Sequence, residues 1–263
     1  MASEYILELE KVSKRFGSAI ALREVSIKLR RGEVHCLLGD NGAGKSTLIK
    51  TLAGVHRPTA GVFRVDGEAV EFQSPRDALD RGIATVYQDL ALVPLMSIAR
   101  NFFLGREPIK QRFGMFPFLD VDTMANVAAE KLRNMGILIR DANQPVGTMS
   151  GGEKQCLAIA RAIHFGARVL ILDEPTAALG VRQSFNVLKL IHKAREQGIS
   201  VIFITHNVHH AYPIGDTFTL LSRGVSVGTF AKEQISKDEV LDIMAGGAEM
   251  RELMSGLDGV RIC

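Results

Sequence analysis

A glycine-rich segment follows a short apolar stretch near the start of the chain. Residues 34–38 read VHCLL and lead into GDNGAGKST, which fits the pattern GxxxxGK[ST]. Glycines let successive backbone N–H groups surround phosphate oxygens, the lysine reaches the β- and γ-phosphates, and the next hydroxyl can ligate Mg²⁺. The alternative is a glycine-rich turn, but a chance match of this pattern is expected only about once in a hundred such chains. The segment predicts an ATP-type phosphate site formed by Gly39, Asp40, Asn41, Gly42, Ala43, Gly44, Lys45, Ser46 and Thr47.

Two consecutive acids end a second apolar stretch. Residues 169–175 read VLILDEP, so Asp173 and Glu174 stand where a buried strand would end. One carboxylate can hold the hydration shell of Mg²⁺, and its neighbour can orient and deprotonate an attacking water molecule. Acids at strand ends are commonly solvated loop residues. After a phosphate-binding loop, however, the pair predicts a metal-binding role for Asp173 and a catalytic base at Glu174.

The segment 148–155, TMSGGEKQ, precedes a run with the apolar spacing of a helix. Ser150 and Glu153 form a capping-box pattern, in which each side chain satisfies a free backbone N–H of the first turn. This pattern leaves Gly151 and Gly152 unexplained, because glycine in a first turn costs about 1 kcal/mol relative to alanine. The two glycines indicate that another group approaches the backbone at this helix start.

Together these motifs resemble those of the ATP-binding subunits of ABC transporters, in which the SGGEKQ segment is the family signature. The other marks of the family follow in the expected order. Phe16 lies 29 residues before Lys45, Gln88 stands in VYQD, and His206 follows VIFIT. The resemblance covers residues 5–245.

The resemblance implies a role for each of these side chains. Phe16 would stack on adenine, Gln88 would join the Mg²⁺ and water shell while sensing a transmembrane partner, and His206 would contact the γ-phosphate. Ser46 and Gln88 would ligate Mg²⁺ directly, and Asp173 would do so through water. Taken alone, Phe16 would be a core aromatic and Gln88 a surface amide. Their positions in the ordered set favour the functional interpretation.

The resemblance also accounts for the two glycines. In this family two subunits face head to tail, and the signature of one lies against the γ-phosphate of the ATP held by the other. Ser150, Gly151 and Gly152 would then offer a hydroxyl and helix-terminal N–H groups to an anion on a neighbouring copy. The chain has one phosphate loop, so a second copy is expected to complete a homodimer.

Two other segments narrow the expectation within the family. Residues 90–108, LALVPLMSIARNFFLGREP, and the PTAALG stretch look like those of ATPases that serve pentose and hexose importers. The resemblance therefore implies import of a monosaccharide through membrane permease subunits, with a sugar-binding protein as an indirect partner. The subunit would be peripheral, on the cytoplasmic face of the cell membrane. One position departs from the family: Gly180 stands where an aspartate that links the two nucleotide sites is usual.

Two other classes of ATPase share the phosphate loop and the signature. DNA-repair and chromosome-organising ATPases place a zinc module or a long coiled coil between them, whereas here 105 residues without a heptad array separate Lys45 from Ser150. Translation factors of the same superfamily carry two ATPase domains joined by a charged linker. The net charge of +3 is spread along the chain, so nucleic acid is not an expected partner. The histidines of HNVHH lack nearby cysteines or carboxylates that would complete a metal site.

The elements that must position these residues alternate between short apolar strands and helical patterns, which is typical of a largely parallel sheet. Strands are expected at 34–38, 169–172 and 201–205, antiparallel strands within 5–30, a hairpin turning at residues 223–224, and a capped final helix after 236. These elements predict an α/β fold of the P-loop NTPase, ABC type: a mixed sheet core with antiparallel N-terminal strands and an inserted helical subdomain.

The same pattern suggests a division of the chain. Residues 1–89 and 158–246 would form the ATP-binding core, 90–157 a helical subdomain that carries the signature, and 247–263 a C-terminal tail.

The aromatic stretch 112–120, RFGMFPFLD, either packs beneath the insertion or docks a partner. The apolar runs are too short to span a membrane, and the N-terminus is unlike a signal peptide. Three cysteines without metal-like spacing favour a reducing cytosol.

Overall fold

A six-stranded sheet forms the centre of the molecule. In the computed structural model, which describes residues 3–112 and 116–246, its strand order is β12-β11-β3-β10-β9-β6. All pairs are parallel except that of the edge strand β12 with β11. The strands are β3 (Val34–Leu38), β6 (Ile83–Val86), β9 (Val169–Asp173), β10 (Ser200–Thr205), β11 (Thr217–Ser222) and β12 (Val225–Ala231). The predicted strands and the hairpin at 223–224 are confirmed, whereas β6 was not predicted.

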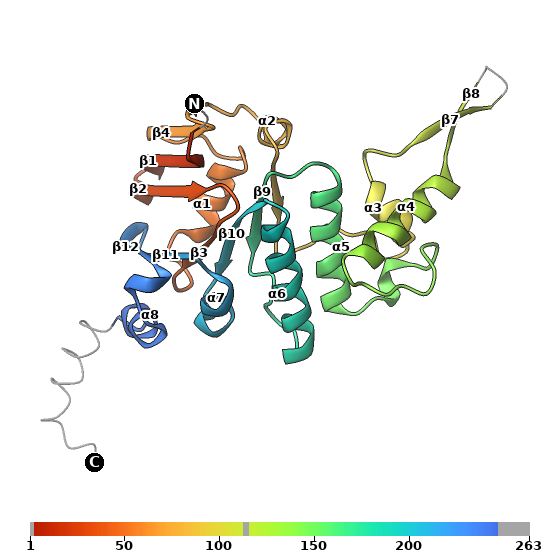
Figure 1. Ribbon diagram of the computed structural model, residues 1–263. Helices are drawn as coiled ribbons and strands as arrows, with labels where there is room; N and C mark the ends of the chain where they lie inside the picture. The colour runs from red at the N-terminus through yellow and green to blue at the C-terminus, as the bar shows by residue number, and fades with distance from the viewer. Residues whose placement is uncertain (1–2, 113–115, 247–263) are drawn as a thin grey trace, which may run out of the picture.

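The N-terminal strands form a sheet of their own instead of extending the central one (Figure 1). Its order is β2-β1-β4-β5, all antiparallel. The strands are β1 (Tyr5–Phe16), β2 (Ala19–Arg30), β4 (Ala60–Val65) and β5 (Glu68–Ala69). Between the two sheets lies helix α1 (Lys45–Leu52), whose Leu48 and Ile49 are buried in the same cluster as Leu7 of β1 and Ile202 of β10.

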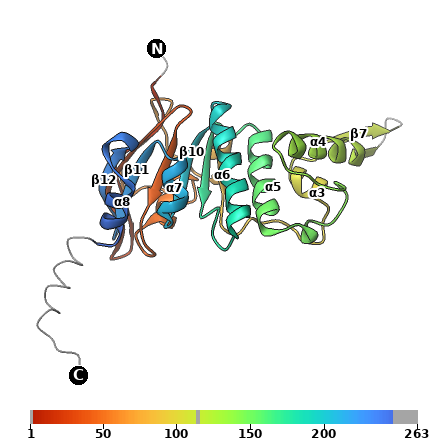
Figure 2. The same ribbon diagram turned by 60° about the horizontal axis from the view of Figure 1, so that its bottom comes forward.

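The other face of the central sheet is covered by a row of helices (Figure 2). They are α5 (Gly151–His164), α6 (Val181–Glu196) and α7 (Val208–Ile214), with α8 (Lys237–Met244) beside β11 and β12. Because side chains alternate between the faces of a strand, Val34, Cys36 and Leu38 pack against this row while Leu37 packs toward α1. The sheet is buried on both faces, as its uninterrupted apolar strands require.

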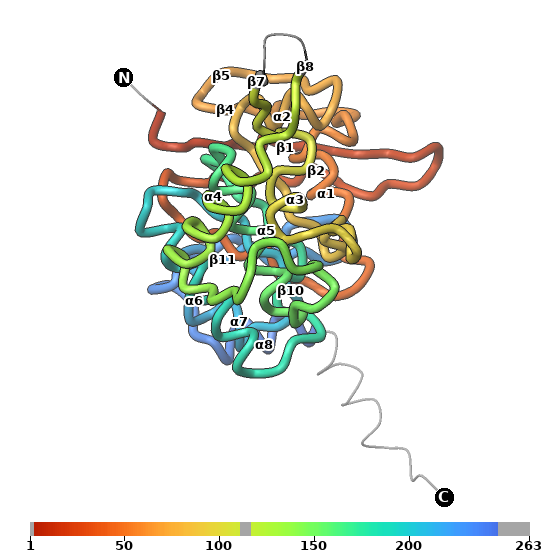
Figure 3. The backbone as a smooth tube through the Cα atoms, turned by 90° about the vertical axis from the view of Figure 1, so that its right-hand side faces the viewer, coloured from red at the N-terminus to blue at the C-terminus, as the bar shows by residue number. Residues whose placement is uncertain are grey.

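The segment between β6 and α5 forms an extension at one end of the molecule (Figures 1 and 3). It contains α3 (Ile98–Phe103), β7 (Ile109–Arg112), β8 (Phe116–Leu119), α4 (Val121–Asn134) and the 3₁₀ turn Val146–Thr148. The strands β7 and β8 form a projecting hairpin where only helices and loops were expected. Phe118 is 53% exposed there, so packing beneath the insertion is wrong for this residue. Phe113 and the side chain of Phe116 lie outside the described residues.

The remaining elements complete the chain. Helix α2 (Pro75–Asp80) precedes β6, and a 3₁₀ turn, Lys232–Gln234, precedes α8. Ser236 and Glu239 form the predicted capping box of α8. Helix α5 crosses the proposed boundary at residues 157–158, and the proposed tail 247–263 lies outside the described residues. In the described part of the chain, no helix is both long and apolar enough to cross a bilayer.

Candidate functional site

The glycine-rich loop connects β3 to α1, as predicted. Gly39 has φ 155°, and a Cβ there would meet the carbonyl oxygen of Leu221 at 2.4 Å, so only glycine fits. Gly44 begins helix α1 with φ 101°, which exposes the first backbone N–H groups of the helix. Lys45 extends back into the loop, where its Nζ donates to the carbonyl oxygens of Gly39 at 2.6 Å and Asp40 at 3.0 Å. The loop is therefore shaped for an anion, with a buried ammonium beside it.

One cavity of 510 Å³ brings the separate motifs together. It is bounded by the loop, by Gln88 after β6, and by both acids at the end of β9. The sheet explains this arrangement, because the carboxyl ends of parallel strands meet at one edge. The lining residues that the sequence had predicted are Asp40, Asn41, Gly42, Gly44, Lys45, Ser46, Thr47, Gln88, Asp173 and Glu174. Gly39 and Ala43 line a neighbouring cavity on the other side of the loop.

Sequence reasoning missed four lining residues that come from two hairpins. Ile20 and Ala21 belong to β2, and Arg223 and Gly224 form the turn between β11 and β12. Gly224 has φ 78°, and a Cβ there would lie 2.5 Å from the carbonyl oxygen of Ala21. The turn itself was predicted from its sequence. Its packing against the phosphate loop was not, because the two segments lie about 200 residues apart in the chain and no local pattern reveals such a contact.

The two acids occupy different environments. Asp173 is half-buried, and burial together with the charge of Glu174 raises the pKa of its carboxyl group, while Lys45 and Lys50 act in the opposite direction. Two adjacent carboxylates near a hydroxyl and an amide offer the oxygen ligands that Mg²⁺ prefers. The donor set of Ser46, Gln88 and Asp173 thus fits this ion, completed by water and phosphate oxygens. A cluster of three or more His, Cys, Asp or Glu ligands does not occur among residues 3–112 and 116–246.

Glu174 is held in one orientation by the end of β10. Its Oε2 accepts a hydrogen bond from the Thr205 hydroxyl at 2.9 Å. Its Oε1 accepts from the backbone N–H of His206 at 3.1 Å and lies 2.8 Å from Nδ1 of the same residue. The backbone of Glu174 has φ 48°, in the left-handed region that residues other than glycine adopt infrequently. The sequence predicted His206 but missed Thr205, whose only signal is a hydroxyl at the end of a buried strand.

Phe16 lies at the end of β1 and is 46% exposed. It does not line the cavity itself, but its ladder partner Ala19 is adjacent to Ile20, which does. Its ring packs against the His56 ring at an interplanar angle of 73°, with centroids 5.1 Å apart. An exposed aromatic ring next to a phosphate site is placed to stack on a nucleobase.

The signature segment begins α5 as a capping box, as predicted. The Ser150 hydroxyl accepts from the N–H of Glu153 at 3.3 Å, and Glu153 accepts from the N–H of Ser150 at 2.7 Å. Packing within this chain also requires glycine at residue 152, because a Cβ there would lie 2.8 Å from Cβ of Gln183 in α6. The expectation that a phosphate alone explains both glycines is thus incomplete. Ser150, Gly151 and Gly152 do not line the cavity around Lys45 in this chain.

Gly180 and His210 have plain structural positions. Gly180 is the exposed N-cap residue of α6, and a Cβ there would meet nothing within 4 Å. His210 places its Nδ1 2.9 Å from the Thr176 hydroxyl. Neither observation indicates a metal site.

Comparison with known proteins identifies the family. The family model described as ABC transporter matches residues 22–177. The xylose/arabinose import ATP-binding protein XylG of Sulfolobus acidocaldarius is 41% identical over 92% of this chain and 95% of its own length. The fructose import ATP-binding protein FrcA of Rhizobium meliloti is 40% identical over 95% of this chain and 97% of its own length.

Other matches agree with these. A putative ribose/galactose/methyl galactoside import ATP-binding protein of Burkholderia lata is 39% identical, and this chain spans 46% of its length. Among solved structures, cbiO1 from Clostridium perfringens has a TM-score of 0.74 at 25% identity, over 95% of both chains. The ATP-binding cassette MJ0796, in a dimer bound to ADP and Pi, has a TM-score of 0.72 at 25% identity, over 87% of this chain and all of its own. The chain belongs to the ABC transporter family, and it has the expected fold of that family's ATP-binding cassettes.

Proposed function

We propose that this chain hydrolyses ATP to drive the import of a monosaccharide through membrane permease subunits. The observation that carries the proposal is the single cavity that joins the phosphate loop, Gln88, Asp173 and the held carboxylate of Glu174. Relatives that align along nearly their whole length are named as import ATP-binding proteins for xylose/arabinose and for fructose. The choice of sugar belongs to the permease and an associated sugar-binding protein.

Each residue of the cavity has a distinct task in this proposal. The loop amides and Lys45 bind the β- and γ-phosphates. Ser46, Gln88 and, through water, Asp173 would hold Mg²⁺, which would supply positive charge beside the phosphates. Glu174 orients a water molecule in line with the γ-phosphate and takes its proton, and His206 fixes the carboxylate and contacts the γ-phosphate.

Two copies of the chain would enclose the ATP molecules between them. Ser150, Gly151 and Gly152 of one copy would complete the site of the other with a hydroxyl and the N-terminus of α5. Their position away from the Lys45 cavity supports a role in trans. The dimeric ATP-binding cassette among the similar structures supports the pairing of two copies.

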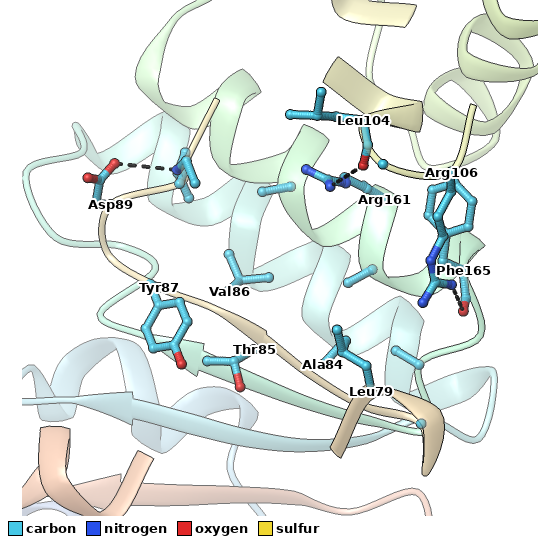
Figure 4. A pocket seen from close by; sticks show the side chains of 17 residues that line it. Leu79, Ala84, Thr85, Val86, Tyr87, Asp89, Leu104, Arg106, Arg161 and Phe165 are labelled. Carbon is cyan, nitrogen blue, oxygen red and sulfur yellow. Dashed lines mark hydrogen bonds between the residues drawn. The ribbon is translucent and has the colours of Figure 1, made fainter. Parts of the chain in front are cut away.

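A second cavity is the proposed docking site for the permease (Figure 4). Its volume is 380 Å³, and it lies between α2, β6, the segment after α3 and the end of α5. Apolar side chains such as Leu79 and Val86 line it, with Arg161 bonded to the carbonyl oxygen of Leu104 at 2.9 Å. Tyr87 lines this cavity while the next residue, Gln88, lines the ATP site. A permease segment seated here would contact Tyr87 and Asp89, the two chain neighbours of Gln88, and would thereby couple docking to the ATP site. The subunit would then lie at the cytoplasmic face of the membrane, with the junction between the sheet and segment 90–157 in contact with the permease.

The test compares two substitutions in the purified protein. We expect Glu174→Gln to bind ATP normally and to hydrolyse it about 100-fold or more slowly, because the water loses its base. Lys45→Ala should instead weaken ATP binding. ATP affinity by equilibrium dialysis and phosphate release measure the two effects. If the Glu174→Gln variant hydrolysed ATP at the parent rate, Glu174 would not be the catalytic base.

A further inference from the structure

Lys14 and Phe16 lie two residues apart on β1, so their side chains share one face of the strand. The Lys14 ammonium sits over the Phe16 ring, 5.0 Å from its centroid. The same Nζ donates a hydrogen bond to the carbonyl oxygen of Arg57 at 2.8 Å. We propose that Lys14 is a positioning residue for the nucleobase: its tethered ammonium holds the exposed Phe16 ring in the orientation that adenine meets. This inference rests on the proposed binding of ATP at the Lys45 cavity.

The segment that contains Arg57, the acceptor of the Lys14 hydrogen bond, is itself hydrogen-bonded to β1. The N–H of Arg15 donates to the Thr59 hydroxyl at 3.1 Å, and the N–H of Thr59 donates to the carbonyl oxygen of Ser13 at 2.7 Å. The segment after α1 therefore runs alongside the end of β1 and cannot move away from it freely. Arg57 belongs to this segment, so its carbonyl oxygen presents a constant acceptor to Lys14.

Two side chains, Lys14 and His56, contact the Phe16 ring. The ammonium lies over the ring, and the His56 ring meets it at an interplanar angle of 73°. A cation over an aromatic ring is attracted by the negative charge of the π face. The contact restricts rotation of an exposed side chain before the nucleotide arrives, and restriction of this kind strengthens binding by lowering its entropic cost. Adenine then meets a ring that is already oriented.

A second lysine over an aromatic ring provides a matched control for the contact of Lys14 with Phe16. Lys28 places its Nζ over the Tyr5 ring at the same distance, 5.0 Å, on the same sheet. Neither Lys28 nor Tyr5 lines the cavity around Lys45. Lys28→Met thus controls for the loss of a lysine over an aromatic ring, and Lys14→Arg restores a cation in place of Lys14.

The experiment measures the dissociation constants of two ligands, ATP and inorganic triphosphate, by calorimetry on the purified chain. Inorganic triphosphate has no base, so it reports the phosphate loop alone. We expect Lys14→Met to weaken ATP binding about 2- to 5-fold, the range of an exposed cation–π contact, and to leave triphosphate binding unchanged. Lys14→Arg should recover most of the ATP affinity, and Lys28→Met should equal the parent. In a Phe16→Ala background, Lys14→Met should have no further effect.

Other outcomes overturn the inference. Unchanged or tighter ATP binding by Lys14→Met would show that the ammonium does not assist the base or obstructs it. An equal loss for ATP and triphosphate would assign Lys14 to general electrostatics or to folding. Failure of the proposed function looks different: the parent protein would bind neither ligand, or Lys45→Ala would bind both as the parent does.

Discussion

At the scale of single residues, the orientation of Glu174 is the most constrained feature of the site. Three donor atoms on Thr205 and His206 surround its two carboxylate oxygens. Its backbone has a positive φ, and its carboxylate faces Thr205 and His206 at the end of β10. A side chain fixed in this way meets a reacting water molecule without first reorganising. Strain and fixed hydrogen bonds at one residue are therefore consistent with the proposed catalytic base.

Asp173 leads to a prediction about stability and pH. Burial, and then the charge of Glu174, raise its pKa above the ordinary value of 3.8, so the folded chain holds this proton more tightly than the unfolded chain. The contribution of Asp173 to folding stability therefore falls as pH rises from about 3.8 through the raised pKa, and the deficit is complete above it. We expect Asp173→Asn to unfold at a higher temperature than the parent at pH 7 without nucleotide, with a smaller difference at pH 4.

Thermal unfolding followed by circular dichroism measures this difference. The exposed Asp89 supplies the control, because Asp89→Asn should leave the unfolding temperature nearly unchanged at both pH values. An Asp173→Asn protein that is less stable than the parent at pH 7 would contradict the expectation.

At the scale of elements, the contact between α5 and α6 connects the signature to the acids. Helix α6 follows the segment after Glu174, and its Gln183 lies against Gly152 in the first turn of α5. Leu179, just before α6, lies against Gly151. The glycines thus allow two helices to approach closely at their N-terminal ends, in addition to leaving backbone N–H groups open.

Substitution of these glycines separates packing from phosphate binding. A Cβ at residue 152 would lie 2.8 Å from Cβ of Gln183, whereas a Cβ at residue 151 would meet only the mobile end of Leu179 at 3.1 Å. We expect Gly152→Ala to lower the free energy of unfolding by about 1–3 kcal/mol, and Gly151→Ala to leave it unchanged or to raise it by up to about 1 kcal/mol through helix propensity. Urea unfolding of the isolated subunit measures both. Equal stability of the two variants would mean that the helices adjust without cost and that the contact does not explain Gly152.

At the scale of the whole molecule, the two cavities share one short segment, in which Gln88 stands between Tyr87 and Asp89. The strand β6 and Tyr87 border the cavity of Figure 4, and Gln88 borders the ATP site. The first cavity also touches the segment after α3 and the end of α5, so it spans the junction between the sheet and the extension. A partner bound there would contact both parts of the molecule at once. In the proposed function, this segment would connect a docked permease to the bound nucleotide.

The proposed dimer leads to a prediction about mixed mutants. If each site combines the phosphate loop of one copy with the signature of the other, Lys45→Ala and Ser150→Arg should each prevent ATP-driven dimerisation of the pure mutant. In a mixture, one site of the heterodimer is intact and the other carries both changes. We expect dimerisation to return in part, which light scattering with ATP and Mg²⁺ measures.

Circular dichroism of each mutant is the control for folding. Dimerisation of the mixture that is no better than that of either mutant alone would count against a shared site. Ser150 would then be left with the helix-capping role that its bonds to Glu153 already show.

Much of this protein is determined by short stretches of sequence. The phosphate loop, the acid pair after β9 and the capping boxes at Ser150 and Ser236 were all predicted correctly in position and local structure. Each depends on residues that are neighbours in the chain, and their local geometry follows from hydrogen bonds and backbone freedom within a few residues. The buried strands were predictable for a similar reason, since an uninterrupted apolar run already implies burial on both faces.

The tertiary structure decided what depends on segments far apart in the sequence. The hydrogen bond from Thr205 to Glu174, the approach of Gly224 to Ala21 and the contact of Gly152 with Gln183 each join different elements. The separation of the N-terminal strands into their own sheet likewise depends on α1 filling the space between the two sheets. A residue pattern records which side chains are apolar or polar, but only packing selects which buried surfaces meet, because many pairings bury similar apolar area.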